Sequence, residues 1–294
     1  MCDGGPEDKW DDETHFEKES VHGEPLHGDR AQCISSHSDS DFLRCSDFFA
    51  DAARLLEALE YQRSYSPSAD DKACATFMLS DYVAATMEVL APQFLHHRIV
   101  PSLAPTDVAL SFQSENLPTD PLRRNMRVVF LSPDLATAGG QRDRRIAEDE
   151  ETMPLADVLR SEIERHFAPL ISHLSILSGL APSAFWRLVA DSVAAEFLSV
   201  GRKMGEEALA KGLALRIVKT AGSPLDNAQL HFFDLDLTAA GEPQKKISLR
   251  ARGGCCRYYT VEGGKLCTTC VLKAPAERDR DLRISLRRRF GLDG

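Results

Sequence analysis

Cysteine side chains are concentrated in one short stretch of this 294-residue chain. Four of the eight cysteines lie within sixteen residues, as an adjacent pair followed ten residues later by a C-x-x-C pair: Cys255, Cys256, Cys267 and Cys270. Four thiolates held together are the donor set of an iron–sulfur cluster or of a structural zinc ion. The spacing therefore predicts a metal centre ligated by these four side chains.

The adjacent cysteines favour one kind of centre over the other. Side chains of neighbouring residues diverge, so both can ligate one small tetrahedral ion only where the backbone bends. A [2Fe–2S] rhomb is larger and offers ligand positions on two irons, which suits an adjacent pair better. The glycine pairs 253–254 and 263–264 can adopt positive φ or let the backbone approach a sulfide closely. Between the cysteine pairs, Arg257–Val261 and Lys265–Cys267 predict a short hairpin.

The C-C-x10-C-x2-C pattern resembles the [2Fe–2S] ferric-siderophore reductases of the FhuF-like family. The resemblance rests mainly on residues 250–272, with weaker support from Trp186-Arg187 inside a predicted helix. It implies that Cys255, Cys256, Cys267 and Cys270 hold a [2Fe–2S] cluster. It also implies one-electron transfer to a ferric siderophore, which releases weakly held Fe(II) for iron assimilation. The partners implied are the ferric siderophore and an external donor, such as a ferredoxin or a flavin or NAD(P)H reductase.

Two alternative functions use the same cysteines. One is a zinc-stabilised module that binds nucleic acid through an arginine-rich C-terminal helix, and the other is an iron–sulfur redox sensor that binds DNA through that helix. The acidic body and the lack of a convincing helix-turn-helix argue against a nucleic-acid partner. Electron transfer requires no general acid or base, so we expect no catalytic residue beyond the cluster ligands. No strand is followed by a glycine-rich dinucleotide fingerprint, so we expect no bound NAD(P)H or flavin.

Composition places the protein among soluble globular chains. The hydrophobic content is 43% and the formal net charge is −10, with no apolar run long enough for a membrane span and no secretory signal at the start. We therefore expect a cytoplasmic location, where thiols stay reduced and bind metal rather than form disulfides. The charge is uneven: residues 1–40 carry 11 acids against 3 bases, and residues 245–294 carry 5 acids against 13 bases. A basic end favours an anionic substrate or an acidic electron donor.

The periodicity of apolar residues predicts an α+β fold with a predominantly helical body, a small antiparallel sheet and a C-terminal iron–sulfur module. Residues 1–40 have the composition of a disordered acidic tail. Residues 41–244 form the expected reductase body, and residues 245–294 form the expected cluster module with its basic helix. The expected helices span about 41–60, 70–95, 152–179, 182–203 and 277–290, and a short helix continues from the fourth of these to about 213. The expected strands span 108–112, 126–131, 229–237 and 245–251, with a loop over 132–152.

Other residues with metal-binding or anion-binding chemistry lack a partner at useful spacing. Cys45 lies on an apolar stripe, and Cys74 is isolated near a helix start, so we expect structural thiols. His166 and His173 are expected to be packed or half-exposed rather than ligands. The same holds for six further histidines and for an arginine-rich loop: His15, His22, His27, His37, His96 and His97, with Cys33, and Arg142, Arg144 and Arg145.

Overall fold

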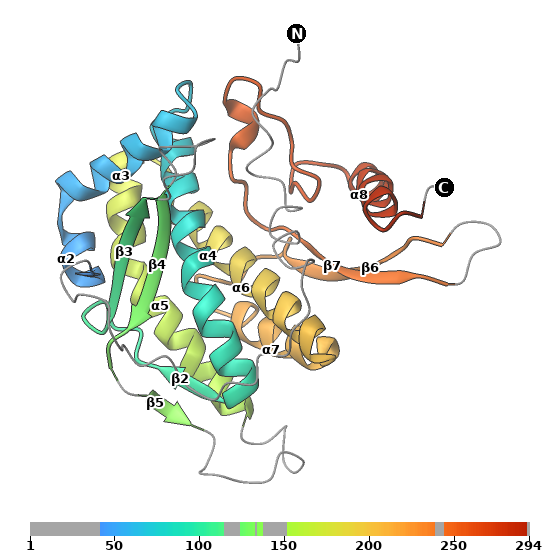
Figure 1. Cartoon of the computed structure of the whole chain (residues 1–294), viewed down its shortest axis with the longest axis horizontal. Coiled ribbons are helices and arrows are strands. Elements are labelled where there is room, and N and C mark those ends of the chain that lie inside the picture. The colour runs from blue at the N-terminus through green and yellow to red at the C-terminus, as the bar shows by residue number, and fades with distance from the viewer. Residues whose placement is uncertain (1–41, 115–123, 133, 138–151, 239–243, 293–294) are drawn as a thin grey trace.

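A computed structural model describes residues 42–114, 124–132, 134–137, 152–238 and 244–292. The expected tail and the Arg142–Arg145 patch lie outside these residues. Helices dominate the body, and a hairpin with the last helix projects from one side of it (Figure 1). The helices are α2 (Cys45–Ala50), α3 (Ala52–Tyr65), α4 (Asp71–His97), α5 (Thr152–Ser178), α6 (Pro182–Met204), α7 (Glu207–Val218) and α8 (Pro275–Arg289).

Helix α4 forms the centre of the body. It packs against α3, α5 and α6, and its side chains are buried on most of its circumference, including Tyr82, Met87 and Phe94. The carboxylate of Asp70 caps its start by accepting the N–H of Ala73. Among the described residues, α4 alone is long and apolar enough to cross a membrane, but most of its apolar window is buried inside the fold. That burial is typical of a core helix.

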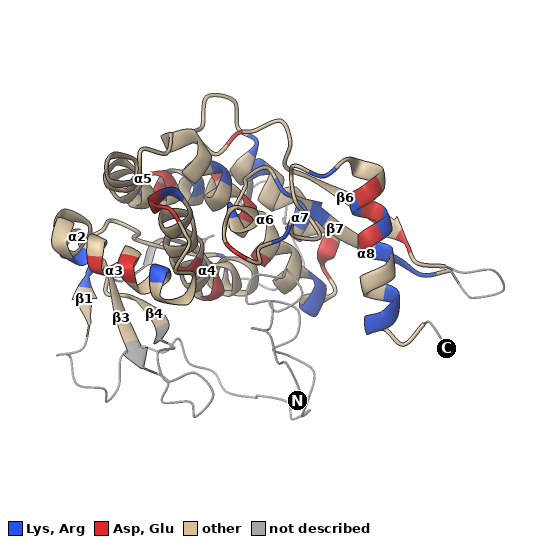
Figure 2. Ribbon diagram, turned by 90° about the horizontal axis from the view of Figure 1, so that it is seen from above, with Lys and Arg blue, Asp and Glu red and all other residues tan. Residues whose placement is uncertain are grey.

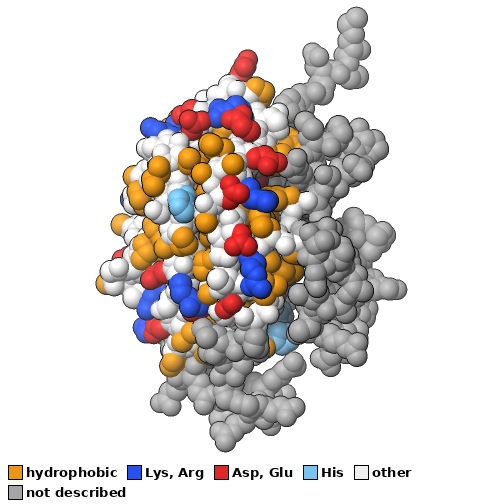
Figure 3. Space-filling model, turned by 90° about the vertical axis from the view of Figure 1, so that its left-hand side faces the viewer, with side chains coloured by type: hydrophobic (Ala, Val, Ile, Leu, Met, Phe, Trp, Pro, Cys, Tyr) orange, Lys and Arg blue, Asp and Glu red, His pale blue; other side chains and the backbone are white. Residues whose placement is uncertain are grey.

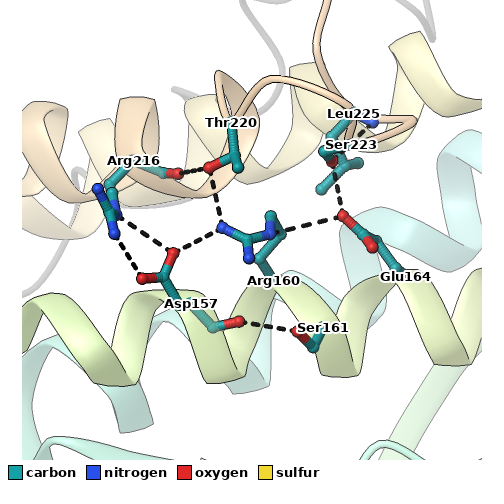
Figure 4. A network of polar contacts seen from close by, with 8 residues as sticks. All are labelled: Asp157, Arg160, Ser161, Glu164, Arg216, Thr220, Ser223 and Leu225. Carbon is teal, nitrogen blue, oxygen red and sulfur yellow. Dashed lines mark hydrogen bonds and ion pairs between the residues drawn. The ribbon is translucent and has the colours of Figure 1, made fainter.

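Helices α6 and α7 lie against each other at very short range. A Cβ added to Gly201 would lie 2.2 Å from the Cβ of Ala210, so only glycine permits this approach. Helix α5 holds the other side of α7 through a polar network (Figure 4). The carboxylate of Asp157 accepts hydrogen bonds from Arg216 and Arg160, and Arg160 also donates one to the hydroxyl of Thr220.

The same network fixes the turn after α7. Ser223 donates to the carboxylate of Glu164 on α5, and its hydroxyl accepts the N–H of Leu225 (Figure 4). The turn continues to Asn227, a buried residue whose side chain accepts the N–H of Leu230. This turn is therefore held in place where it meets the cysteine segment described below.

The described residues form three small antiparallel sheets beside the helices. One has the order β1 (Leu43–Arg44), β3 (Val108–Ser114), β4 (Arg124–Phe130), with Leu110 opposite both Leu43 and Val128. The second pairs β2 (Ile99–Pro101) with β5 (Asp134–Thr137). The third is a hairpin of β6 (His231–Asp236) and β7 (Lys246–Ala251).

The β6–β7 hairpin and α8 share a small core of their own. Five buried leucines from these elements pack together, namely Leu235, Leu237, Leu249, Leu282 and Leu286. Arg278 of α8 stacks on the ring of Phe233 at 4.0 Å from the ring centre. Basic residues are concentrated in the last turn of α8, where the ribbon is blue (Figure 2). The last helix is thus attached to the hairpin by apolar packing and by arginine contacts.

The structure confirms the α+β, predominantly helical class and corrects three local predictions. The helix expected over 41–60 is two helices, because Asp51 leaves helical geometry and caps α3 by accepting the N–H groups of Ala53 and Arg54. Part of the loop expected over 132–152 is strand β5, which pairs with a strand that was not predicted. The hairpin expected between the cysteine pairs is a 3-10 turn, η2 (Tyr258–Thr260), followed by a left-handed Gly263.

The end of the body farthest from α8 carries α2 and α3. Hydrophobic side chains are interspersed with charged ones over this face (Figure 3). Leu56 of α3 and Phe112 of β3 are among the exposed apolar side chains. Many of the charged groups there pair with a neighbour on the same helix or the next one, as Arg63 does with Glu60 and Asp71.

Candidate metal centre

The four cysteines lie in the segment that joins β7 to α8. Cys256, Cys267 and Cys270 are buried and Cys255 is half-buried, and none of the four forms a disulfide. The η2 turn lies between the pairs, and a tight turn brings the N–H of Cys270 to the carbonyl of Cys267 at 3.0 Å. These turns bring the second cysteine pair back to the first, so that Cys267 contacts Cys256.

Direct contacts link the thiols of the two pairs. A hydrogen bond to Cys267 and burial raise the pKa of the Cys256 thiol, and a hydrogen bond from Cys267 lowers the pKa of Cys270 to about 7. Burial raises the pKa of Cys255, whose sulfur accepts the N–H of Arg257 at 3.4 Å. Within the described residues, no group of three or more His, Cys, Asp or Glu side chains is arranged to hold a single metal ion. The thiols are neighbours rather than the corners of one closed tetrahedron.

The first glycine pair is held by helix α6. Asp191, only 1% exposed, accepts the N–H of Gly253 at 2.8 Å with one carboxylate oxygen and that of Gly254 at 2.9 Å with the other. A Cβ on Gly253 would lie 2.0 Å from Oδ1 of Asn227, and one on Gly254 would lie 3.1 Å from the backbone of Arg187. A side chain at Gly253 would collide with the 220–227 turn, and one at Gly254 would fit only if α6 gave way by a few tenths of an ångström.

The second glycine pair shapes the turn between the cysteine pairs. Gly263 has a φ of +74°, a left-handed conformation that favours glycine. A Cβ on Gly264 would lie 2.0 Å from the carbonyl oxygen of Tyr258. Of the two roles expected for the glycine pairs, positive φ is found at Gly263. At Gly253, Gly254 and Gly264 the atoms at short range are protein atoms.

Helix α4 supports the segment from the other side. Thr76 donates to the carbonyl oxygen of Cys256 at 2.8 Å, and Arg257 pairs with the α4 cap Asp70 at 3.0 Å. Nearby, Ser68 accepts the N–H of Glu262. The cysteine segment is thus held between the N-terminal end of α4 and the middle of α6.

A buried cation lies beside the thiols. The guanidinium of Arg252 donates to Sγ of Cys267 at 3.7 Å and lies 3.5 Å from the Asp191 carboxylate, and its side chain is only 12% exposed. Its positive charge lowers the pKa of Cys255 and Cys256, opposing the larger effects that raise them. A fixed positive charge at this place favours thiolates over thiols.

Four chemically distinct features thus meet in one segment: four free thiols, close backbone approach, an adjacent cation and rigid support from two core helices. Comparison with protein families gives two matches. The family of ferric iron reductase FhuF-like transporters matches residues 78–230, just over half of the chain, and the FhuF 2Fe-2S C-terminal domain matches residues 252–272. The chain belongs to the FhuF-like family. Comparison with curated proteins and with solved structures gave no match.

The match to the FhuF C-terminal domain identifies the cofactor as a [2Fe–2S] cluster. Four neighbouring thiols fit this group, because a [2Fe–2S] cluster takes four cysteine sulfurs, two on each iron. The matched range begins at Arg252 and extends past Cys270, so it covers all four cysteines. It ends before α8, and the FhuF body match ends at Leu230, just before β6.

The other candidates from the sequence take structural places in this FhuF-like protein. Cys45 and Cys74 are fully buried, and Cys45 lies 3.1 Å from the hydroxyl of Tyr82. His166 is fully buried between Tyr82, at 2.5 Å, and the carbonyl of Leu103, at 2.7 Å. His173 is exposed, and His96 and His97 end α4. The tail histidines and Cys33 lie outside the described residues.

Sequence reasoning missed the residues that support the cysteines. Asp191, Asn227 and Thr76 come from three separate parts of the chain, so no short motif contains them, whereas Arg252 lies only three residues before Cys255. The sequence does contain one signal for Asp191, because this carboxylate lies within an apolar part of α6, close to Val189 and Ala190. A charged residue on a buried helix face indicates a partner elsewhere in the fold.

Proposed function

We propose that this protein is a cytoplasmic ferric-siderophore reductase in which Cys255, Cys256, Cys267 and Cys270 hold the [2Fe–2S] cluster. The family matches establish membership of the FhuF-like family and a 2Fe-2S domain. The observation that carries the proposal is the meeting of the four thiols in one supported segment. When bound, a [2Fe–2S] cluster supplies one electron at a time.

A single electron is sufficient for the proposed reaction. Oxygen donors of a siderophore hold ferric iron tightly, whereas high-spin ferrous iron is held far more weakly. Reduction of the bound iron by one electron therefore allows Fe(II) to dissociate from the siderophore. This release needs no general acid or base from the protein. The side chains required are those that hold the electron carrier and those that let the chelate approach it. A one-electron donor, such as a ferredoxin or a flavin or NAD(P)H reductase, restores the reduced state.

The thiol segment has an accessible edge that suits electron exchange. Cys255 is half-buried, and apolar side chains next to the cysteine pairs are exposed to solvent: Tyr259 (43%), Leu266 (37%) and Leu272 (54%). Lys265 is also exposed at this edge. We propose this edge, which we call the thiol edge, as the place where the chelate or the electron donor approaches. Beside Lys265 the edge also exposes Glu262, so its exposed apolar side chains, rather than a net charge, favour the approach of a chelate or a donor protein.

The nucleic-acid alternatives have less support from the contacts of α8. Arg278 is stacked on Phe233, Arg283 donates to the carbonyl of Asp236, and Arg287 donates to that of Leu237. These arginines attach the helix to the β6–β7 hairpin. They are therefore not a free row of cations directed at phosphates, which is what a nucleic-acid-binding helix presents.

The deciding experiment uses anaerobically purified full-length protein. Iron and sulfide are counted on one sample, and low-temperature EPR spectra are recorded before and after reduction with dithionite. We expect about two irons and two sulfides per chain and a spin-half signal only after reduction. The reduced protein is then mixed with ferric hydroxamate, catecholate and carboxylate siderophores in the presence of a chelator specific for Fe(II). Reoxidation with matching Fe(II) release supports the proposal, whereas one zinc and no sulfide, or a reduced protein that no ferric chelate reoxidises, rejects it.

A further inference from the structure

The Asp191 carboxylate makes three contacts at the start of the cysteine segment. It accepts the N–H groups of Gly253 and Gly254, one with each oxygen, and it pairs with the guanidinium of Arg252. The backbone carbonyl of the same residue accepts a hydrogen bond from Arg250. Asp191 of α6 thus contacts four of the five residues that precede Cys255, namely Arg250, Arg252, Gly253 and Gly254.

Burial makes these contacts strong. Asp191 is 1% exposed, and a buried carboxylate is stable only where charge or hydrogen bonds compensate for lost water. Two N–H groups and a cation provide that compensation here. Because both oxygens are used, the carboxylate fixes the orientation of the glycine pair as well as its position. The fixed glycine pair in turn determines the backbone orientation of Cys255 and Cys256, which follow it directly.

The other end of the arginine reaches a sulfur. Arg252 donates from Nη1 to Sγ of Cys267, which belongs to the second cysteine pair. The guanidinium is therefore a bridge from α6 to the second pair, while Asp191 itself holds the first pair. A positive charge and an N–H donor next to a cysteine sulfur stabilise the more negative, reduced state of an iron–sulfur centre.

We propose that Asp191 and Arg252 are a positioning pair for the iron–sulfur site: Asp191 anchors the Cys255-Cys256 segment, and Arg252, oriented by Asp191, raises the reduction potential through Cys267. This inference rests on the proposed ligand set. It adds two residues outside the cysteines, one of them more than sixty positions earlier in the chain, that set the properties of the centre. Neither residue is a ligand.

The electrostatic part is tested with Arg252→Gln, Arg252→Lys and the control Arg280→Gln. Arg280 is an exposed α8 residue paired with Asp281, so the control removes the same charge from the same region. Potentials are measured by anaerobic redox titration with EPR detection. We expect Arg252→Gln to lower the reduced-to-oxidised ratio at a fixed potential at least tenfold, which is 59 mV for one electron. Arg252→Lys should restore most of the shift, and Arg280→Gln should match the wild type.

The anchoring part is tested with Asp191→Asn and the control Asp226→Asn. Asp226 is exposed in the turn that holds Asn227, so its substitution removes a nearby charge without touching the glycines. The amide nitrogen of Asn cannot accept an N–H, so one glycine loses its partner. We expect Asp191→Asn to lose iron to a chelator at least ten times faster than the wild type, and Asp226→Asn to lose it at the wild-type rate. Hydrogen exchange at Gly253 and Gly254 should also accelerate only in Asp191→Asn.

The outcomes separate this pair from the function proposed above. Equal potentials in Arg252→Gln and Arg280→Gln, or a positive shift in Arg252→Gln, overturn the electrostatic role. Equal iron loss and equal exchange in the two Asp variants overturn the anchoring role. If Arg252→Gln assembles no cluster, the neutral variant Arg252→Met takes its place beside Arg280→Gln, and equal potentials in these two variants overturn the electrostatic role. A wild type without iron and sulfide would reject the ligand set, and hydrogen exchange would still decide whether Asp191 anchors the segment.

Discussion

The hydroxyl of Thr76 lies 2.8 Å from the carbonyl oxygen of Cys256, a contact between residues 180 positions apart in the chain. The same hydroxyl lies 2.8 Å from the carbonyl of Ala73 within α4. Its single proton therefore serves two acceptors, and the second acceptor is the backbone of a proposed cluster ligand. Because Thr76 is fully buried, water cannot replace it.

Replacement of Thr76 by valine should destabilise the protein and loosen the cysteine segment. Valine keeps the shape but leaves the Cys256 carbonyl buried without a donor, at a cost of about 1–3 kcal/mol. Urea denaturation of wild type and Thr76→Val, with iron content measured on the same samples, checks this. Thr76→Ser keeps the hydroxyl and should stay closer to the wild type. Equal stability of the valine and serine variants would show that the hydrogen bond from Thr76 to the Cys256 carbonyl does not stabilise the protein.

Two glycine-to-alanine substitutions should change stability in opposite directions. In Gly264→Ala the new methyl would lie 2.0 Å from the carbonyl of Tyr258, so the η2 turn must distort and the free energy of unfolding should fall. Gly212 lies exposed inside α7 with open space around its Cα, so Gly212→Ala should add about 0.5–1 kcal/mol by helix propensity. Thermal and urea unfolding of the two variants provide the comparison. A stabilised Gly264→Ala would show that the turn is looser than described.

Stability should depend on the protonation of His166 at acid pH. Burial lowers the pKa of His166 from 6.5 to about 4, so the folded state keeps it neutral while the unfolded state binds a proton below 6.5. The contribution is therefore complete above pH 6.5 and is lost as the pH falls towards 4, by roughly 3 kcal/mol in total. Denaturation midpoints of wild type and His166→Gln between pH 4 and 7.5 isolate this contribution. His173→Gln, at an exposed site, should keep the wild-type slope, and an unchanged slope in His166→Gln would contradict the prediction.

Replacement of Cys267 should remove the cluster and spare the helical body. Cys267 contacts both Cys256 and Cys270 and receives the Arg252 donor, so it is the most connected of the four thiols. We expect Cys267→Ser to lose iron, colour and ferric reductase activity while its far-ultraviolet circular dichroism stays near that of the wild type. Cys74→Ser is the matched control, since Cys74 is a buried thiol outside the segment. Normal absorbance and turnover in Cys267→Ser would exclude Cys267 from the ligand set.

The long helices were predictable because one face of each is buried throughout. The periodic apolar residues of α4 and α5 gave both helices with ends close to those observed. Asp51 shows why the first helix was wrong. The apolar repeat continues across it, yet its carboxylate stabilises a new helix start, and this choice between interior and cap depends on how the two pieces pack.

The cysteine pattern was predictable because four side chains of one rare type lie close together in the sequence. The residues that support the cysteine segment could not be predicted, because they reach it only through tertiary contacts. Asp191 is recognised only when α6 meets Gly253 and Gly254, and Asn227 only when the turn after α7 meets Gly253. The expected hairpin failed for a related reason. Contacts with α4 and a left-handed Gly263 determine the path of this segment, whereas strand propensity has little influence.

The two helices that hold the cysteine segment precede it in the chain, and this order has a consequence during translation. Synthesis proceeds from the N-terminus, so α4 and α6 leave the ribosome well before Cys255 does. Thr76 and Asp191 are therefore already in the growing chain when the thiols emerge. The surface that holds the cysteines is therefore synthesised before the thiols that it must protect from oxidation.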